Sequence, residues 1–207
     1  MTKLCVFDFD STLMDGETIN EISAACGQKA AVSAITERAM AGELDFFEAL
    51  TARVELLVGI PYPQVLSICH QLPLMPGAME TVRTLKQLGY KVVVFSGGFR
   101  QATAYFGEKL GVDAEFANIL HHKDGFLTGK VGGEMMFNDS KGKMLQRLQQ
   151  LLGISPEQTI AVGDGANDAS MFPFAAKKVA FCAREILQKQ ANVVIQEKDL
   201  RLLLDYL

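Results

Sequence analysis

The chain has 207 residues, of which 49% are hydrophobic and 21% charged, so it can bury the core of one large domain, and extensive disorder is excluded. Its 20 Lys and Arg against 24 Asp and Glu give a net charge of −4 without a basic block, which argues against nucleic acid as a partner. No apolar run approaches the roughly 20 residues of a membrane span, and the N-terminus lacks the apolar region of a signal peptide, so we expect no membrane partner and a cytoplasmic location. The cysteines are scattered and are expected to be reduced thiols: Cys5, Cys26, Cys69 and Cys182.

The first predicted elements are a short buried strand and a long helical insertion. Residues 4–7 form an apolar run that ends at two acids, Asp8 and Asp10. Residues 17–72 contain no convincing strand and several helical patterns, one of which Asp45 can cap while Glu48 reaches back to it. Residues 72–77, with two prolines and a glycine, are expected to end the insertion.

Strands and helices alternate along the rest of the chain. Runs rich in β-branched residues predict strands at residues 90–95, 159–162, 179–181 and 193–195. Periodic patterns predict helices at residues 78–88, 100–110, 143–152 and 166–176. Residues 116–137 break the alternation and, with Asp124-Gly125 between alternating segments, predict a β-hairpin.

This order of elements predicts an α/β fold. We expect a Rossmann-like parallel sheet with helices on both faces, plus an inserted helical cap and a small β-hairpin. The expected domains are a catalytic core of residues 1–14 and 76–207, with the hairpin at about 116–137, and a helical cap of residues 15–75. This cap of residues 15–75 is the helical insertion.

Acidic residues follow two of the predicted strands. Asp8 and Asp10 project to the same side of the first strand, and two buried carboxylates need a compensating cation. The alternative is that they only cap a turn through Ser11 and Thr12. Asp164 and Asp168 follow another buried strand, at the edge where open α/β sheets bind ligands. Oxygen ligands without His or Cys suit a hard cation such as Mg²⁺.

Two further segments could contact an anion. Ser96-Gly97-Gly98 follows a strand and precedes a helix, so its hydroxyl and main-chain N–H groups can cradle a phosphate, although two glycines after a strand more often form just a tight turn. Lys141 opens a helix within a polar stretch, where a solvated lysine is the simpler interpretation.

Taken together, these segments resemble a known family. Residues 8–12 (DFDST), 96–98 (SGG), Lys141 and residues 163–168 (GDGAND) are similar, in order and spacing, to the four motifs of the haloacid dehalogenase-like phosphohydrolases. Within that superfamily the resemblance is to the phosphoserine phosphatases. It covers essentially the whole chain and includes Glu17, FSGGF at 95–99, FAN at 116–118, GDGANDASMF at 163–172 and AFCA at 180–183.

The resemblance implies a reaction and the residues that perform it. The expected activity is Mg²⁺-dependent hydrolysis of O-phosphoserine to serine and phosphate, the last step of serine biosynthesis, through an aspartyl-phosphate. It makes Asp8 the nucleophile and Asp10 the general acid and base, so Asp10 must titrate unlike Asp8, while Lys141 and the metal neutralise the transferring group. The implied metal ligands are Asp8, the Asp10 main-chain carbonyl and Asp164, with Asp168 close behind.

The resemblance also implies the substrate contacts. The phosphate would lie against Ser96, the Gly97 N–H, Lys141 and Asn167, the ammonium against Glu17 and the carboxylate against Arg53. Met40, Phe46 and Phe47 match positions near the pocket of the family. From the residues alone, Arg53 can equally form an exposed ion pair with Glu48 or Glu55. The expected oligomeric state is a monomer or homodimer.

Two rival functions use similar chemistry. A phosphotransferase that passes the phosphoryl group from phosphoserine to an alcohol such as homoserine would use the same aspartyl-phosphate. A signalling receiver also stores phosphate on an aspartate near Mg²⁺ and a lysine, but it needs no substrate cap, so the additional ~60 residues argue against it.

Overall fold

The computed structural model describes residues 2–207, which form an α/β fold around one sheet. Its strand order is β4-β3-β2-β1-β5-β6-β7, and every neighbouring pair is parallel except β3 and β4. The predicted fold class is therefore confirmed. The strands are β1 (Lys3–Phe7), β2 (Tyr90–Phe99), β3 (Ala114–Lys123), β4 (Phe126–Gly133), β5 (Thr159–Gly163), β6 (Lys177–Phe181) and β7 (Val193–Ile195).

The helices are close to those expected, with two differences in detail. The segment expected as a helix over residues 166–176 is a 3₁₀ helix that contains Pro173, and the helix expected from residue 143 already begins at Ser140. Pro173 lacks an N–H, which is unfavourable in an α-helix interior. The α-helices are α1 (Thr18–Ala25), α2 (Lys29–Met40), α3 (Phe46–Glu55), α4 (Tyr62–His70), α5 (Ala78–Gln87), α6 (Arg100–Leu110), α7 (Ser140–Leu152) and α8 (Glu185–Gln188), and the 3₁₀ helices are η1 (Pro156–Gln158), η2 (Ala166–Phe174) and η3 (Leu200–Tyr206).

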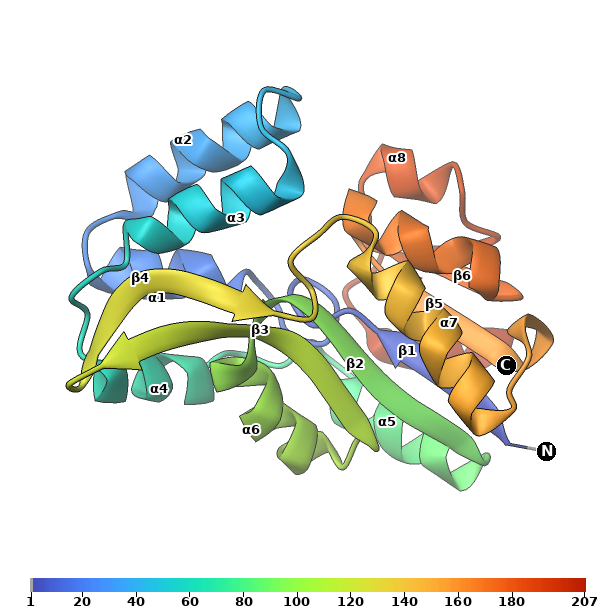
Figure 1. The fold of residues 1–207 in the computed structure, drawn as a ribbon. Helices are drawn as coiled ribbons and strands as arrows, with labels where there is room; N and C mark the ends of the chain where they lie inside the picture. The colour runs from blue at the N-terminus through green and yellow to red at the C-terminus, as the bar shows by residue number, and fades with distance from the viewer. Residues whose placement is uncertain (1) are drawn as a thin grey trace.

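The central strand β1 is buried on both faces of the sheet. Cys5 and Phe7 belong to the apolar cluster that includes α5 and α6, whereas Leu4 and Val6 belong to a second cluster with α7 and η2. Figure 1 shows α5 and α6 below the sheet and α7 in front of it. Because successive side chains of a strand point to opposite faces, an uninterrupted apolar run is what a doubly covered strand requires.

The helical insertion contains four helices, α1 to α4, and none of its residues belongs to a named strand. The predicted cap of α3 is present: the Glu48 N–H donates to Asp45 at 2.8 Å, and the Asp45 N–H donates to the Glu48 carboxylate at 3.0 Å. Figure 1 shows α2 and α3 standing away from α5, α6 and α7, beyond one end of the sheet. The insertion shares its apolar cluster with the α5 and α6 side through Ile22, Leu50 and Val54.

The predicted hairpin forms the edge of the main sheet. Strands β3 and β4 meet at Asp124-Gly125, where φ is +50° and +83°, and β3 pairs in parallel with β2. The tip of the hairpin also contacts the helical insertion, because the Tyr62 N–H donates to the Gly125 carbonyl at 2.8 Å. The hairpin thus supports the insertion as well as extending the sheet.

The segment expected as a turn after the second predicted strand is itself strand. Strand β2 continues through Ser96, Gly97 and Gly98 to Phe99, and α6 begins at the next residue. The register with β3 shifts between Ser96 and Phe99, which marks a bulge at the two glycines. The alternative of a simple tight turn is therefore wrong.

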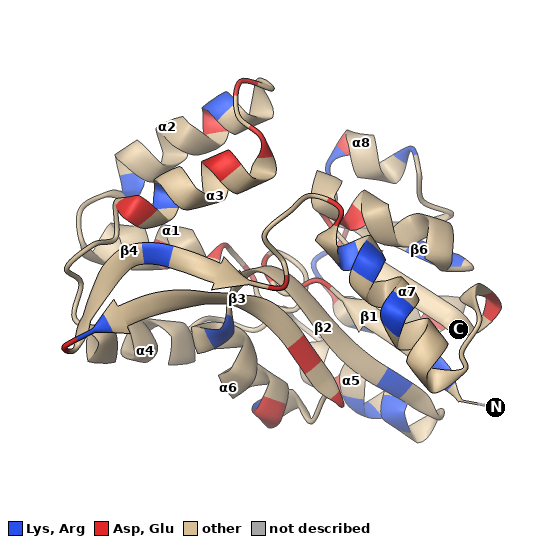
Figure 2. Ribbon diagram, viewed as in Figure 1, with Lys and Arg blue, Asp and Glu red and all other residues tan. Residues whose placement is uncertain are grey.

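The distribution of charged residues and the state of the cysteines agree with what the sequence indicates. In residues 2–207, no helix has both the length and the apolar character that a bilayer crossing demands. Figure 2 shows Lys and Arg scattered among Asp and Glu over the molecule. All four cysteines are free thiols, of which Cys5 and Cys69 are buried and Cys26 and Cys182 half-buried.

Helix α7 approaches η2 closely at a glycine, which gives a stability prediction. The Gly142 N–H donates to Ser170 Oγ at 3.1 Å, and a Cβ at residue 142 would collide with the Ser170 main-chain carbonyl. We expect Gly142→Ala to destabilise the protein by about 1–3 kcal/mol, measured by urea unfolding.

The matched control for this prediction is a second helical glycine. In α6, a Cβ at Gly107 would lie 3.3 Å from a Val112 methyl group, a tight contact that stops short of a collision. Gly107→Ala should be close to neutral, because improved helix propensity of about 1 kcal/mol offsets mild crowding. Equal unfolding midpoints for wild type and Gly142→Ala would contradict the prediction, because they would show that α7 and η2 can move apart without a loss of stability.

Candidate active site

The carboxyl ends of β1, β2 and β5 bring the predicted site residues together. Asp8 directly follows β1, Asp164 directly follows β5, and the parallel pairing of β1 with both β2 and β5 aligns these strand ends. A cavity of about 570 Å³ lies here, between the strand ends and helices α2 and α3. Its charged lining residues are Asp8, Asp10, Glu17, Asp45, Arg53, Asp164 and Arg184.

All the predicted site residues lie in or beside this cavity. Gly97 and Asn167 also line it. Ser96, Lys141 and Asp168 are buried against the lining acids and are linked to them by the hydrogen bonds and ion pairs described below. Residues from five separate segments of the chain thus converge on one place.

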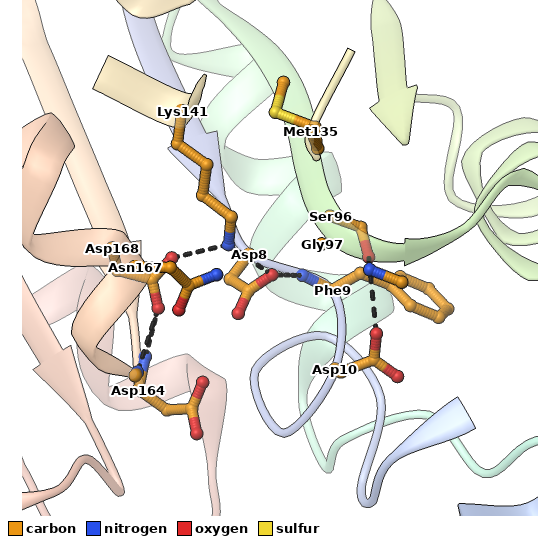
Figure 3. A network of polar contacts seen from close by, with 12 residues as sticks. Asp8, Phe9, Asp10, Ser96, Gly97, Met135, Lys141, Asp164, Asn167 and Asp168 are labelled. Atoms are coloured by element: carbon orange, nitrogen blue, oxygen red, sulfur yellow. Dashed lines mark hydrogen bonds and ion pairs between the residues drawn. The ribbon is translucent and has the colours of Figure 1, made fainter. Parts of the chain in front are cut away.

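Lys141 is the buried cation of the site. Only 2% of this residue is exposed, and its Nζ lies 2.7 Å from Asp8 Oδ1 and 2.6 Å from Asp168 Oδ1 (Figure 3). Burial by itself would lower the pKa of Lys141, but the two carboxylates raise it above its ordinary value. Lys141 is therefore charged, and the alternative of a solvated lysine is wrong.

Asp168 organises the loop that carries Asp164. Its Oδ2 accepts the main-chain N–H groups of Asp164 at 3.0 Å and Gly165 at 2.9 Å, while its Oδ1 holds Lys141. A Cβ at Gly163 would occupy the place of the Asp168 carboxylate, so this approach requires glycine. Both oxygens of Asp168 already have protein partners, which leaves the carboxylates of Asp8 and Asp164 more open to a ligand.

The three carboxylates form a concentrated negative centre. One oxygen from each of Asp8, Asp164 and Asp168 lies within 4.8 Å of the others. Burial, reinforced by Asp168, raises the pKa of Asp8 well above its ordinary range and that of Asp164 to about 7. Lys141 supplies a single positive charge, so the donor set suits an additional hard cation with oxygen ligands.

Asp10 has different partners from Asp8. Its Oδ1 accepts the Thr18 N–H at 2.7 Å and the Thr18 hydroxyl at 2.6 Å, and its Oδ2 accepts the Ser96 hydroxyl at 3.3 Å. Neither Ser11 nor Thr12 donates to it within residues 2–207, so the turn-cap alternative is wrong.

Burial raises the pKa of both Asp8 and Asp10, and the opposing contacts differ. For Asp10 the main opposing contacts are the hydrogen bonds from Thr18 and Ser96, whereas for Asp8 the main one is the ammonium of Lys141. The donors around Asp10 thus stabilise its ionised form and oppose the effect of burial. The expected difference in titration remains a prediction.

The residues predicted to contact phosphate lie close to the helical insertion. Ser96 Oγ accepts the Gly98 N–H at 2.9 Å, and a Cβ at Gly98 would collide with the Asp10 carboxylate. A Cβ at Gly97 would lie 2.8 Å from the Phe46 ring, so Phe46 packs over this glycine. Met40 also lines the cavity.

One aromatic residue expected near the pocket lies elsewhere. Phe47 is not among the lining residues and stacks on Phe137 with ring centroids 5.5 Å apart. Consecutive residues of a helix point about 100° apart, and at this place in α3 the Phe47 side chain lies against Phe137, outside the cavity that Phe46 lines.

Glu17 and Arg53 face the cavity from the helical insertion. Glu17 accepts the Ser11 hydroxyl at 2.9 Å, and burial followed by the nearby Asp10 raises its pKa to about 7. Arg53 Nε donates to the Ala49 carbonyl at 3.1 Å, and burial lowers its pKa while Glu17 and Asp10 oppose the change. Within residues 2–207, Arg53 has no ion pair to an acid of its own helix, so that alternative is not observed.

Sequence reasoning gave no role to two residues that the structure places at the site. Thr18 holds Asp10, as described above, and Arg184 lines the cavity while its N–H donates to the Asp164 carbonyl at 3.0 Å. Arg184 follows β6 at the same sheet edge as Asp8 and Asp164, which is the signal that could have indicated it. No spacing rule points to Thr18.

Comparisons with known proteins agree with this geometry. The haloacid dehalogenase-like hydrolase family matches residues 2–175. A phosphoserine phosphatase of Wolinella succinogenes is 61% identical, and the alignment covers 99% of this chain and 100% of the relative. The chain belongs to the phosphoserine phosphatase family of haloacid dehalogenase-like hydrolases.

Other members of the phosphoserine phosphatase family extend the likeness to structure. The phosphoserine phosphatase of Methanocaldococcus jannaschii is 47% identical over 99% of this chain and 97% of its own. A solved phospho-aspartyl intermediate analogue of phosphoserine phosphatase superposes with a TM-score of 0.95 at 47% identity, covering 100% of this chain and 99% of that one. A substrate-bound phosphoserine phosphatase complex, 46% identical with the same coverage, also gives 0.95.

Proposed function

We propose that this protein hydrolyses O-phosphoserine to serine and phosphate through an aspartyl-phosphate on Asp8. The observation that carries the proposal is the buried ion pair of Lys141 with Asp8 and Asp168, together with a cavity that Asp8, Glu17 and Arg53 line. One end of the cavity suits a phosphoryl group and the other an amino acid. The phosphoserine phosphatase relatives support the same substrate.

Asp8 is the nucleophile of the first step. Its Oδ1 already accepts the Phe9 N–H at 2.7 Å and contacts Lys141, so we assign the attack on phosphorus to Oδ2. A bond forms between Oδ2 and phosphorus while the bond from phosphorus to the seryl oxygen breaks. Asp10 gives its proton to the departing seryl oxygen, and serine leaves.

Asp10, which has lost its proton in the first step, acts as the general base of the second step. Its carboxylate takes a proton from water, the resulting nucleophile attacks phosphorus, and the bond to Asp8 breaks to release phosphate. The hydrogen bonds from the N–H and the hydroxyl of Thr18 hold the Asp10 carboxyl in place through both steps. The Ser96 hydroxyl, the Gly97 N–H, Lys141 and Asn167 hold the phosphoryl oxygens.

The negative centre is proposed to bind Mg²⁺. The residues that would hold it are Asp8, the main-chain carbonyl of Asp10 and Asp164, with Asp168 behind them. When bound, the cation would neutralise charge on the phosphoryl group, on which phosphoryl transfer depends.

The helical insertion, residues 15–75, is proposed to serve as a cap over a core of residues 1–14 and 76–207. Glu17 would bind the substrate ammonium and Arg53 its carboxylate. Only Nε of Arg53 donates a hydrogen bond to its own helix, so the two terminal nitrogens of the guanidinium group remain for a bidentate contact. A cytoplasmic location, a monomeric or homodimeric state and the absence of nucleic-acid or membrane partners stay predictions.

The two rival functions differ in acceptor and in architecture. Transfer to an alcohol such as homoserine would use the same aspartyl-phosphate and differ only in the second acceptor, whereas a receiver would not need the insertion or the cavity beneath it. The hydrolase relatives favour hydrolysis.

Phosphate release tests the function directly. Purified protein with Mg²⁺ should release phosphate from O-phosphoserine without any added alcohol, and Asp8→Asn should lose about 10³-fold or more in kcat because the amide cannot form the ester. Circular dichroism should show that Asp8→Asn is folded. Release that requires homoserine would instead establish a phosphotransferase.

The proposed metal is tested by stability without any turnover. Mg²⁺ at 100 times its Kd should stabilise wild type by about 2.7 kcal/mol, measured as a rise in Tm. Asp164→Asn should lose most of this rise, whereas Asp205→Asn, at an exposed position, should keep it.

The pH dependence follows from the raised pKa of Asp164. A folded-state pKa of about 7 means that protons compete with the cation as the pH falls, so the Mg²⁺-induced rise in Tm should shrink between about pH 8 and about pH 6. A rise that is independent of both Asp164 and pH would place the cation elsewhere.

The carboxylate clamp is tested with two substrates. Arg53→Ala should lower kcat/KM for phosphoserine about 10- to 100-fold, mainly through KM, because a charged hydrogen bond contributes about 1.5–3 kcal/mol. Phosphoethanolamine, which lacks the carboxylate, should be affected far less. Arg147→Ala, on the exposed side of α7, is the control. Equal losses for both substrates in Arg53→Ala would contradict the proposed contact of Arg53 with the substrate carboxylate.

A further inference from the structure

Ser11 has an unusual backbone conformation for its residue type. It is one of three non-glycine residues with positive φ in residues 2–207, at +57°, alongside Asp124 in the hairpin turn and Cys182. This left-handed region costs a residue with a Cβ about 1 kcal/mol or more. Nothing in the reaction proposed above uses Ser11.

The conformation of Ser11 folds the chain back on itself. The Ser11 N–H donates to the Gly16 carbonyl at 2.8 Å, and Gly16 has φ of +142°, which favours glycine. The closed loop of residues 11–16 returns the chain to Ser11 at the start of α1. Glu17, the next residue, is thereby placed beside the Ser11 side chain.

The Ser11 hydroxyl then holds the Glu17 carboxylate. Its Oγ donates to Glu17 Oε1 at 2.9 Å, and within the part of the chain that the structure describes no other side chain donates a hydrogen bond to Glu17. Arg53 and Arg184 act on Glu17 only through space. One oxygen of the carboxylate is therefore fixed by the core-side loop, and Oε2 is left for a ligand.

We infer that Ser11 is a positioning residue that directs Glu17 toward the substrate amino group and so sets selectivity for amino-bearing phosphate esters. The inference rests on the proposed function and deepens it. A glutamate side chain has several rotatable bonds, and holding it in one geometry before binding removes an entropy cost that the ligand would otherwise meet. The hydroxyl also favours the charged carboxylate that an ammonium needs.

The test compares O-phosphoserine with 3-phosphooxypropionate, which keeps the phosphate and carboxylate but lacks the amino group. In Ser11→Ala the ratio of kcat/KM for the two substrates should fall about 10-fold, the lower limit for one hydrogen bond to a charged group, because Ser11 acts on the substrate only through Glu17. The change should appear mainly in KM for phosphoserine. Ser67→Ala, on the exposed face of α4, is the matched control.

A double-mutant cycle separates positioning from general damage. If Ser11 acts through Glu17, Ser11→Ala should not lower the ratio further in a Glu17→Gln background. An equal further loss in that background, or an unchanged ratio in folded Ser11→Ala, overturns the inference.

Ser11→Gly separates the hydroxyl from the backbone strain. Glycine accepts positive φ without cost, so this variant should match or exceed wild type in Tm and still lose the selectivity. Retained selectivity in Ser11→Gly would assign the effect to loop shape and overturn the inference. A wild-type enzyme with no preference for phosphoserine would overturn the proposed function as well, which distinguishes the two failures.

Discussion

The buried contact of one ammonium with two carboxylates is the interaction on which the site depends. Lys141 lies between Asp8 and Asp168, and Asp168 in turn binds the loop that presents Asp164. Removing one partner from such a group leaves an uncompensated buried charge, which costs several kcal/mol. The same contact orients the nucleophile and leaves a net negative centre that a divalent cation and a phosphoryl group can share.

A second constraint connects the chemistry to substrate selection. Asp10 is held by Thr18 at the start of α1, and the adjacent Glu17 is held by Ser11 next to Asp10. The short segment between β1 and α1 thus carries both the proposed acid and the proposed amine contact. A displacement of the helical insertion would disturb both groups, because each is hydrogen-bonded across the same junction.

Much of the architecture could be predicted because it depends on local patterns. The apolar run before Asp8, the uninterrupted helical patterns of the insertion and the Asp45 cap each reflect periodicity or hydrogen bonding within a few residues. The predictions were less accurate where tertiary contacts decided the outcome. Strand β2 continues past Ser96 because β3 pairs with Ser96 and Phe99 on either side of the bulge, and the 3₁₀ helix after Asp164 contains Pro173 and packs against α7.

The sequence by itself determined the chemistry of the site, since the acids, the lysine and the glycine-containing segments are recognisable by residue type, order and spacing. Only the tertiary structure decided which of them touch: that Lys141 contacts both Asp8 and Asp168, and that Asp10 binds Thr18 rather than its own turn. The reason is physical. Side-chain hydrogen bonds depend on ångström-scale distances between segments far apart in the chain, and local sequence patterns carry no information about those distances.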